Sequence, residues 1–144
     1  MTIEVNWIAI ILAAISSMIV GSLWYGPLFG KLWIRLANVK RDPNSTTQKE
    51  VLMYLKTFLS SLLTAIVLAY VIAMVHNGSA DTYFVDAVFV GMMLWAGFTA
   101  ARVFMHDMFE GRPTQLTALT IAHELVTIVV MSIIIGLLPV IIQA

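Results

Sequence analysis

The fold is decided by residues 5–30, which read VNWIAIILAAISSMIVGSLWYGPLFG and contain no Asp, Glu, Lys or Arg. A membrane-spanning helix needs about 20 mainly apolar residues, because each residue adds about 1.5 Å and the hydrocarbon layer is roughly 30 Å thick. The stretch meets that length, and as a helix it would have no polar stripe to face water. We therefore expect a transmembrane helix over residues 6–25.

Three later segments have the same character. Residues 57–80 and 87–101 contain no Asp, Glu, Lys or Arg, and neither does any part of the chain after Glu124. Each of these segments forms part of an expected helix that is long enough to span a membrane. The last helix ends before Pro139, because proline cannot continue a helix. The four expected helices cover residues 6–25, 54–75, 83–105 and 115–138.

The composition of the whole chain supports the same class. Of 144 residues, 60% are hydrophobic and 11% are charged, whereas an ordinary soluble domain is about 25% charged. So few charges cannot cover the outside of a water-soluble globule. We expect a single all-α, polytopic membrane domain over residues 1–144, with four transmembrane helices and a short interfacial helix after the first.

Composition also excludes several functions. Eight Lys and Arg balance eight Asp and Glu, so the chain lacks the excess of positive charge that nucleic acid binding needs. The absence of cysteine excludes disulfides, a thiol nucleophile and a thiolate metal site. The first apolar run is too long for a secretory signal peptide and has no basic segment before it, so we expect no cleavage there.

The basic residues predict the orientation. All of them fall between the first and second expected helices or near the turn between the third and fourth: Lys31, Arg35, Lys40, Arg41, Lys49, Lys56, Arg102 and Arg112. The N-terminal segment, residues 76–86 and the C-terminal tail contain no Lys or Arg. By the positive-inside rule, we expect both termini outside and both basic loops in the cytoplasm.

Small side chains recur every fourth residue in the first two expected helices. One row is Ala9, Ala13, Ser17 and Gly21, and the other is Ser61, Ala65, Ala69 and Ala73. Such rows let helix backbones approach closely in lipid, either within one chain or between subunits. The alternative is that Ala and Ser are simply common in such helices.

A short amphipathic helix is expected over residues 27–37. Pro27 is suited to the first turn of a helix, and aromatic side chains favour the level of the lipid headgroups. The segment would lie in the cytoplasmic interface. The expected interface anchors are Trp24, Tyr25, Pro27, Lys31 and Trp33.

The third and fourth expected helices form a tight antiparallel hairpin. Gly111 suits a left-handed helix end and Pro113 cannot continue a helix, so the chain turns near Arg112. Pairing residues at equal distances from this turn predicts one intramembrane polar cluster. Its members are Arg102, His106, Asp107, Glu110, His123 and Glu124.

This cluster has three alternative interpretations. An ion pair between Arg102 and Glu124, with a hydrogen-bonded His123, would lock the hairpin. A relay through Glu124, His123 and His106 would carry protons or ions. A metal site from the same groups has less support, because no HExxH motif is present and adjacent helical residues point about 100° apart. We expect no metal and no other cofactor.

Several motifs resemble a small bacterial membrane family. They are the Asn-Trp pair at residues 6–7, GSLWYGPLFGKLW at residues 21–33, FEGRP at residues 109–113, and His123 within an apolar helix. The family is catalogued as domain of unknown function 1761, and the resemblance covers nearly the whole chain. It implies a four-span protein of the bacterial inner membrane, and it implies no activity.

Two functions are compatible with these features. One is a small oligomeric transporter or channel that uses the polar cluster for a solute or ion. The alternative is a non-catalytic membrane component that binds lipid or a partner helix, with the cluster as a structural ion pair. The expected partners are the lipid bilayer and a second copy of the chain, and an enzyme is the less favoured class.

Overall fold

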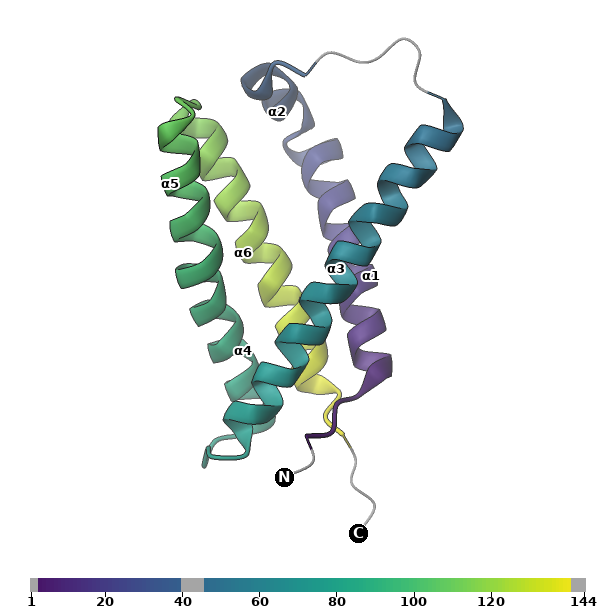
Figure 1. Ribbon diagram of the computed structural model, residues 1–144, viewed down its shortest axis with the longest axis vertical. Helices are drawn as coiled ribbons and strands as arrows, with labels where there is room; N and C mark the ends of the chain where they lie inside the picture. The colour runs from purple at the N-terminus through teal and green to yellow at the C-terminus, as the bar shows by residue number, and fades with distance from the viewer. Residues whose placement is uncertain (1–2, 40–45, 141–144) are drawn as a thin grey trace.

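The computed structural model describes residues 3–39 and 46–140. This part of the chain is helical and contains no strand (Figure 1). The elements in order are α1 (Trp7–Leu23), the π-helical turn η1 (Trp24–Leu28), α2 (Gly30–Ala37), α3 (Thr47–His76), α4 (Tyr83–Leu94), the π-helical turn η2 (Trp95–Ala100), α5 (Ala101–Phe109) and α6 (Thr114–Leu137).

The expected all-α membrane architecture is confirmed. Among the described residues, four helical runs are long and apolar enough to cross a membrane: Trp7–Leu28, Thr47–His76, Tyr83–Phe109 and Thr114–Leu137. The second run begins at Thr47 rather than near residue 54. The apolar pattern marks only the part of a helix that crosses hydrocarbon, whereas α3 continues beyond it through polar residues.

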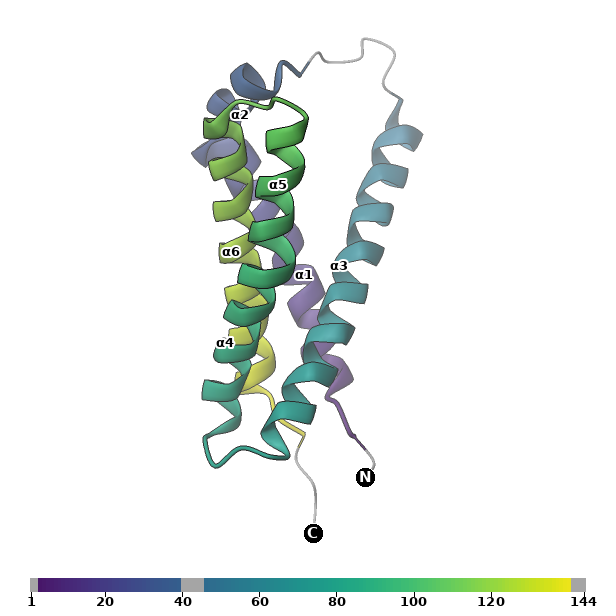
Figure 2. The same ribbon diagram turned by 60° about the vertical axis from the view of Figure 1, so that its left-hand side comes forward.

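The helices converge at one end of the molecule and diverge at the other. Both views show the second half of α3 lying against the other helices and its first half leaning away from them (Figures 1 and 2). The start of α1 and the end of α6 lie at the convergent end, while α2 and the turn between α5 and α6 lie at the divergent end. The divergence of α3 therefore opens the bundle on one side only.

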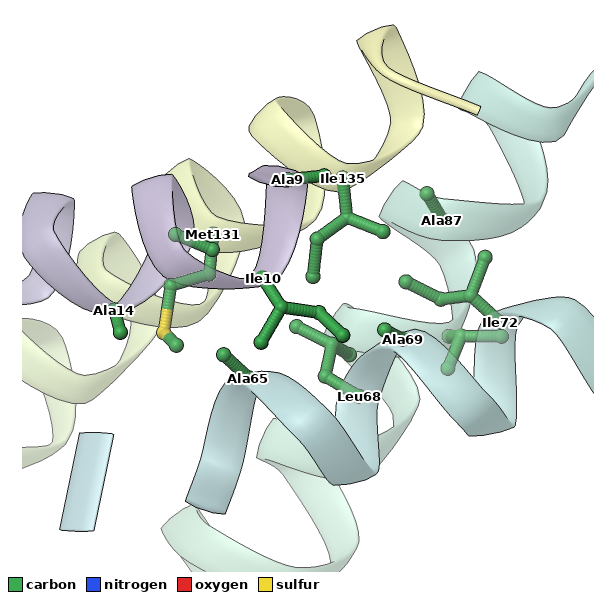
Figure 3. Close-up of a cluster of buried hydrophobic side chains, with 12 residues drawn as sticks. Ala9, Ile10, Ala14, Ala65, Leu68, Ala69, Ile72, Ala87, Met131 and Ile135 are labelled. Carbon is green, nitrogen blue, oxygen red and sulfur yellow. The ribbon is translucent and has the colours of Figure 1, made fainter. Parts of the chain in front are cut away.

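Buried apolar side chains fill the convergent half. The largest fully buried apolar side chains are Ile10, Leu68, Ile72, Met131 and Ile135. They point toward one another from α1, α3 and α6 (Figure 3). This packing holds the three helices together where the bundle is closed.

Small residues allow these helices to approach closely. Ala9, Ala13 and Ser17 are buried on α1, which packs against both α3 and α6, and Ala65, Ala69 and Ala73 are buried on α3. Both predicted rows therefore contribute buried residues to contacts within one chain.

A second close approach joins α4 and α6. A Cβ atom added to Gly136 would lie 2.9 Å from the Cβ of Ala87 and 3.1 Å from the Cα of Phe84. Gly91 similarly faces Ser132 without room for a side chain. This seam was not predicted, although Ala87 and Gly91, like Ser132 and Gly136, are small residues four positions apart.

Polar side chains fix the convergent end. The amide of Asn6 caps α1 by accepting from the backbone N–H groups of Ile8 and Ala9, and it donates to the carbonyl of Leu138 at 3.1 Å. The start of α1 is thereby held to the end of α6. Buried Asp86 accepts from Ser79 at 2.8 Å and lies 2.7 Å from His76, which ties α4 to the end of α3.

Candidate functional site

A cleft of about 690 Å³ lies between α1, α3 and α6, where α3 leaves the bundle. Its lining includes carbon-rich side chains, among them Met18, Met53 and Met131, together with Trp33 of α2. Most of the exposed surface of the cleft is apolar, but many of the lining side chains also carry a polar atom. Its polar side chains are Ser17, Ser22, Tyr25, Tyr54, Thr57, Ser60, Ser61, Thr64, His123, Glu124 and Thr127.

The α3 side of the cleft is a face of hydroxyl groups. Thr57, Ser60, Ser61 and Thr64 follow the spacing i, i+3, i+4, i+7, which places them on one face of a helix. Thr57 donates to the carbonyl of Met53 at 2.9 Å, and Thr64 donates to the carbonyl of Ser60 at 3.1 Å. Each hydroxyl oxygen also accepts, so this face presents acceptors to whatever fills the cleft.

The α6 side carries the ionisable groups. Nδ1 of His123 lies 3.2 Å from Oε1 of Glu124, and its Nε2 lies 3.5 Å from the hydroxyl of Thr127. The His123 side chain is 12% exposed and that of Glu124 is 42% exposed. The imidazole is therefore enclosed by protein, while the carboxylate is open to the cleft.

Aromatic rings enclose the imidazole from the end of α1. The His123 ring centre lies 4.8 Å from that of Tyr25 and 5.9 Å from that of Trp24. The Tyr25 ring in turn lies 5.2 Å from that of Trp33, which lies on α2. A continuous aromatic wall therefore runs from α2 to His123, and the predicted interface anchors Trp24, Tyr25 and Trp33 belong to it.

The π-helical turn η1 positions this wall. Pro27 has no N–H to donate to the preceding turn, and the backbone widens so that the N–H of Phe29 donates to the carbonyl of Trp24 at 2.9 Å. The wider turn presents Trp24 and Tyr25 together toward α6. The remaining predicted anchors, Pro27 and Lys31, lie in η1 and α2 without lining the cleft.

A second π-helical turn, η2, packs against α6 from another helix. The indole N–H of Trp95 donates to the carbonyl of Ile121 at 3.1 Å. Two π-helical turns thus contact α6 within a few residues of His123. Such turns inside α-helices are frequent at functional sites, which supports the choice of the region around His123 as the candidate functional site.

The structure divides the predicted polar cluster into two groups. His123 and Glu124 belong to the cleft. The others, apart from Arg102, gather at the turn between α5 and α6. Asp107 is buried there and accepts from the hydroxyl of Thr117 at 2.8 Å.

Arginine and glycine complete this turn. Nε of Arg112 lies 2.6 Å from a carboxylate oxygen of Glu110 and 3.7 Å from one of Asp107. The backbone N–H of Arg112 donates to the backbone carbonyl of Asp107 at 3.0 Å. Gly111 has φ of +67°, in the left-handed region that glycine adopts without strain. Pro113 precedes α6. The second group is therefore a hydrogen-bonded, ion-paired helix turn.

Arg102 joins neither group. It is exposed on α5, and within the described ranges 3–39 and 46–140 no ion pair links it to Glu124. Glu124 lines the cleft between α1 and α3, so the ion pair that would lock the hairpin is not formed.

One group at the turn has the spacing of metal ligands. Single ligand atoms of His106, Asp107 and Glu110 lie within 4.8 Å of one another. His106 and Glu110 are exposed, however, and the guanidinium of Arg112 already supplies positive charge to both carboxylates. The arrangement fits a salt-bridged turn better than a metal centre.

These features define a multi-pass, all-α membrane protein with a polar cleft between its helices. The chain belongs to the family described as "Protein of unknown function (DUF1761)", whose sequence profile matches residues 8–136. The resemblance seen in the sequence motifs is thereby confirmed. No curated protein and no solved structure matches the chain.

Proposed function

We propose that this protein is a small membrane transporter whose solute or ion binds in the polar cleft. The observation that carries the proposal is the cleft of about 690 Å³ with hydroxyl groups on α3 and the His123–Glu124 pair on α6. Ionisable side chains within membrane-spanning helices are costly, and they commonly mark the path of a substrate or ion. The volume also falls within the range of small-molecule sites, roughly 300–1,000 Å³.

Glu124 is the group proposed to bind the transported proton or cation. Its carboxylate is open to the cleft, whereas His123 is enclosed and contacts it at 3.2 Å. A carboxylate can release a proton when a cation arrives and recover it when the cation leaves. The imidazole beside it can donate a hydrogen bond to the carboxylate.

The arrangement of the helices supports the proposed orientation. Basic residues of α2, of the start of α3 and of the α5–α6 turn lie at the divergent end, opposite the start of α1 and the end of α6 (Figure 1). With the positive-inside rule, the divergent end would face the cytoplasm of a bacterial inner membrane. The cleft would then open nearer the cytoplasmic side, and a second copy is proposed to cover its open flank.

Proton flux in reconstituted vesicles tests the transport proposal. Liposomes with a trapped pH-sensitive dye, an imposed pH gradient and valinomycin with potassium for charge compensation report that flux. We expect the gradient to collapse faster with the protein than in protein-free liposomes. Glu124→Gln should return the rate to that of protein-free liposomes, whereas Glu110→Gln, at the exposed turn, should not change it.

Two controls make this result decisive. Size-exclusion chromatography in detergent must show Glu124→Gln to be as monodisperse as the unmodified chain, so that lost flux is not lost fold. A protein that collapses the gradient no faster than empty liposomes, or an active Glu124→Gln variant, would contradict the proposal that Glu124 carries protons across the membrane.

The second candidate function is binding of lipid or a partner helix in the cleft. It is favoured by the first half of α3, which leans away from the bundle and exposes Val51, Leu55 and Leu59. Ser61→Trp would fill the cleft with a ring. If the cleft holds a partner helix or a lipid, this variant should lose a subunit or a tightly bound phospholipid, as native mass spectrometry in detergent can detect.

A further inference from the structure

We infer that the ligand of the cleft is an organic ammonium ion with an apolar substituent. This inference deepens the proposed function by naming its solute class, and it rests on the same cleft.

The charge of the lining favours a cation. Among the described residues that line the cleft, Glu124 is the sole carboxylate and none is Lys or Arg. The basic side chains Lys31 and Lys56, on α2 and α3, are outside the lining. An ionised carboxylate between membrane helices is stabilised by a positive partner and would repel an anion. Nδ1 of His123 lies 3.2 Å from Oε1 of Glu124 and can donate a hydrogen bond to it.

The aromatic wall favours an organic cation over a metal ion. Tyr25 and Trp33 lie side by side, 5.2 Å between ring centres, and Tyr54 lines the cleft from α3. Faces of Trp and Tyr rings attract ammonium groups through their π electrons, and this attraction strengthens where water is excluded. Calcium takes about 6–8 oxygen ligands and favours several carboxylates, which a lining with one carboxylate does not supply.

The size and the remaining lining favour an apolar substituent on that cation. A volume of about 690 Å³ far exceeds what a bare ion requires. Met18, Met53 and Met131 provide flexible, polarisable contacts that adapt to varied apolar shapes. Hydroxyl groups such as those of Thr57 and Ser61 can accept from an N–H or contact a polar rim. The site therefore combines a carboxylate, aromatic faces and adaptable apolar walls.

Binding of matched probes tests this inference. Isothermal titration calorimetry in a neutral detergent would compare benzyltrimethylammonium, benzenesulfonate and benzyl alcohol, which share a ring but carry positive, negative and no charge. We expect the ammonium probe to bind at least tenfold more tightly than the other two. Equal binding of the sulfonate, or no binding of the ammonium probe, would overturn the inference.

Variants locate the probe. Glu124→Gln should weaken binding of benzyltrimethylammonium at least tenfold, and Trp33→Leu should weaken it severalfold while Trp33→Phe retains it. Glu110→Gln is the matched carboxylate control and should bind as the unmodified chain does. If Glu124→Gln does not fold, the comparison of Trp33→Leu with Trp33→Phe and the comparison of the three probes still test the inference. Unchanged binding in both Glu124→Gln and Trp33→Leu would place the probe elsewhere and overturn the inference.

The outcome separates this inference from the transport proposal. Proton flux that needs Glu124, without ammonium binding, would overturn the solute class and leave transport standing. Ammonium binding that needs Glu124, without proton flux in liposomes that also contain benzyltrimethylammonium, would leave the solute class standing and make the protein a binding component.

Discussion

The ring of His123 on α6 lies 4.8 Å, centre to centre, from the ring of Tyr25 in the π-helical turn that ends α1. Tyr25 in turn contacts Trp33 on α2, so α2 is connected to the ionisable pair of the cleft through two ring contacts. The tryptophan–tyrosine–glycine–proline motif thus has a structural explanation. Its proline widens the backbone, and the wider turn presents the aromatic rings to α6.

Tyr25 is therefore predicted to hold His123 through its ring. Tyr25→Leu removes the ring contact and should lower the thermal unfolding midpoint modestly, since such aromatic pairs contribute about 0.5–1.5 kcal/mol. It should also reduce the Glu124-dependent proton flux. Tyr25→Phe keeps the ring and should preserve most of both properties. Thermal unfolding in detergent and flux in liposomes measure the two effects, and equal behaviour of Leu and Phe at this position would contradict the prediction.

The membrane spans were readable from the sequence because they depend on one property. An uncharged run of about 20 residues is typical of a membrane span, and such runs predict the first two helices directly. The third and fourth helices reach spanning length only when their shorter uncharged runs are extended through Asp86, Arg102 and Glu124. The start of α3 at Thr47 could not be predicted, because polar residues form helix outside the membrane as readily as they form a loop. The length of the apolar run therefore does not predict where the polar extension of α3 begins.

The division of the polar cluster was not readable in the same way. Equal spacing from the hairpin turn predicts which residues lie at the same level along two antiparallel helices, but not the direction in which each side chain points. Arg102 is exposed on α5, whereas Glu124 lines the cleft between α1, α3 and α6. The cleft itself depends on how far α3 leans from the bundle. The spacing of Thr57, Ser60, Ser61 and Thr64 places their hydroxyl groups on one face of a helix, but no sequence pattern indicates what that face adjoins.

Buried Asp107 is predicted to stabilise the α5–α6 turn. Its carboxylate accepts from Thr117 at 2.8 Å and has Arg112 at 3.7 Å, and the side chain is 6% exposed. Asp107→Ala should lower stability by about 1–3 kcal/mol, because the variant leaves Thr117 and Arg112 without their partner. Chemical or thermal unfolding in detergent measures this cost.

Two comparisons isolate the role of Asp107. Thr117→Val should cost about 1 kcal/mol, because it removes one hydrogen bond, whereas Glu110→Gln at the exposed edge of the turn should cost little. A double variant of Asp107 and Thr117 should cost less than the sum of the single variants, since both lose the same bond. Additive costs would show that the two side chains do not act through each other.

The seam between α4 and α6 makes the sharpest stability prediction. Gly136→Ala places a Cβ 2.9 Å from that of Ala87 and 3.1 Å from the backbone of Phe84, and neither atom can rotate away. The helices must separate, and overpacking of this kind typically costs about 1–3 kcal/mol. Gly97→Ala is the matched control, since nothing lies within 4 Å of its added methyl group. Alanine also favours helix over glycine by up to about 1 kcal/mol, so that variant should be neutral or more stable.

A compensating substitution identifies the cause of the loss at Gly136. Ala87→Gly removes the nearer of the two obstructing atoms, so the double variant should recover part of the unfolding midpoint lost in Gly136→Ala. The recovery must exceed the helix-propensity cost of the new glycine, about 1 kcal/mol, to be seen. If Gly136→Ala and Gly97→Ala unfold at the same temperature, α4 and α6 do not pack as closely as this seam requires. A double variant below both single variants would instead show that the two positions act independently.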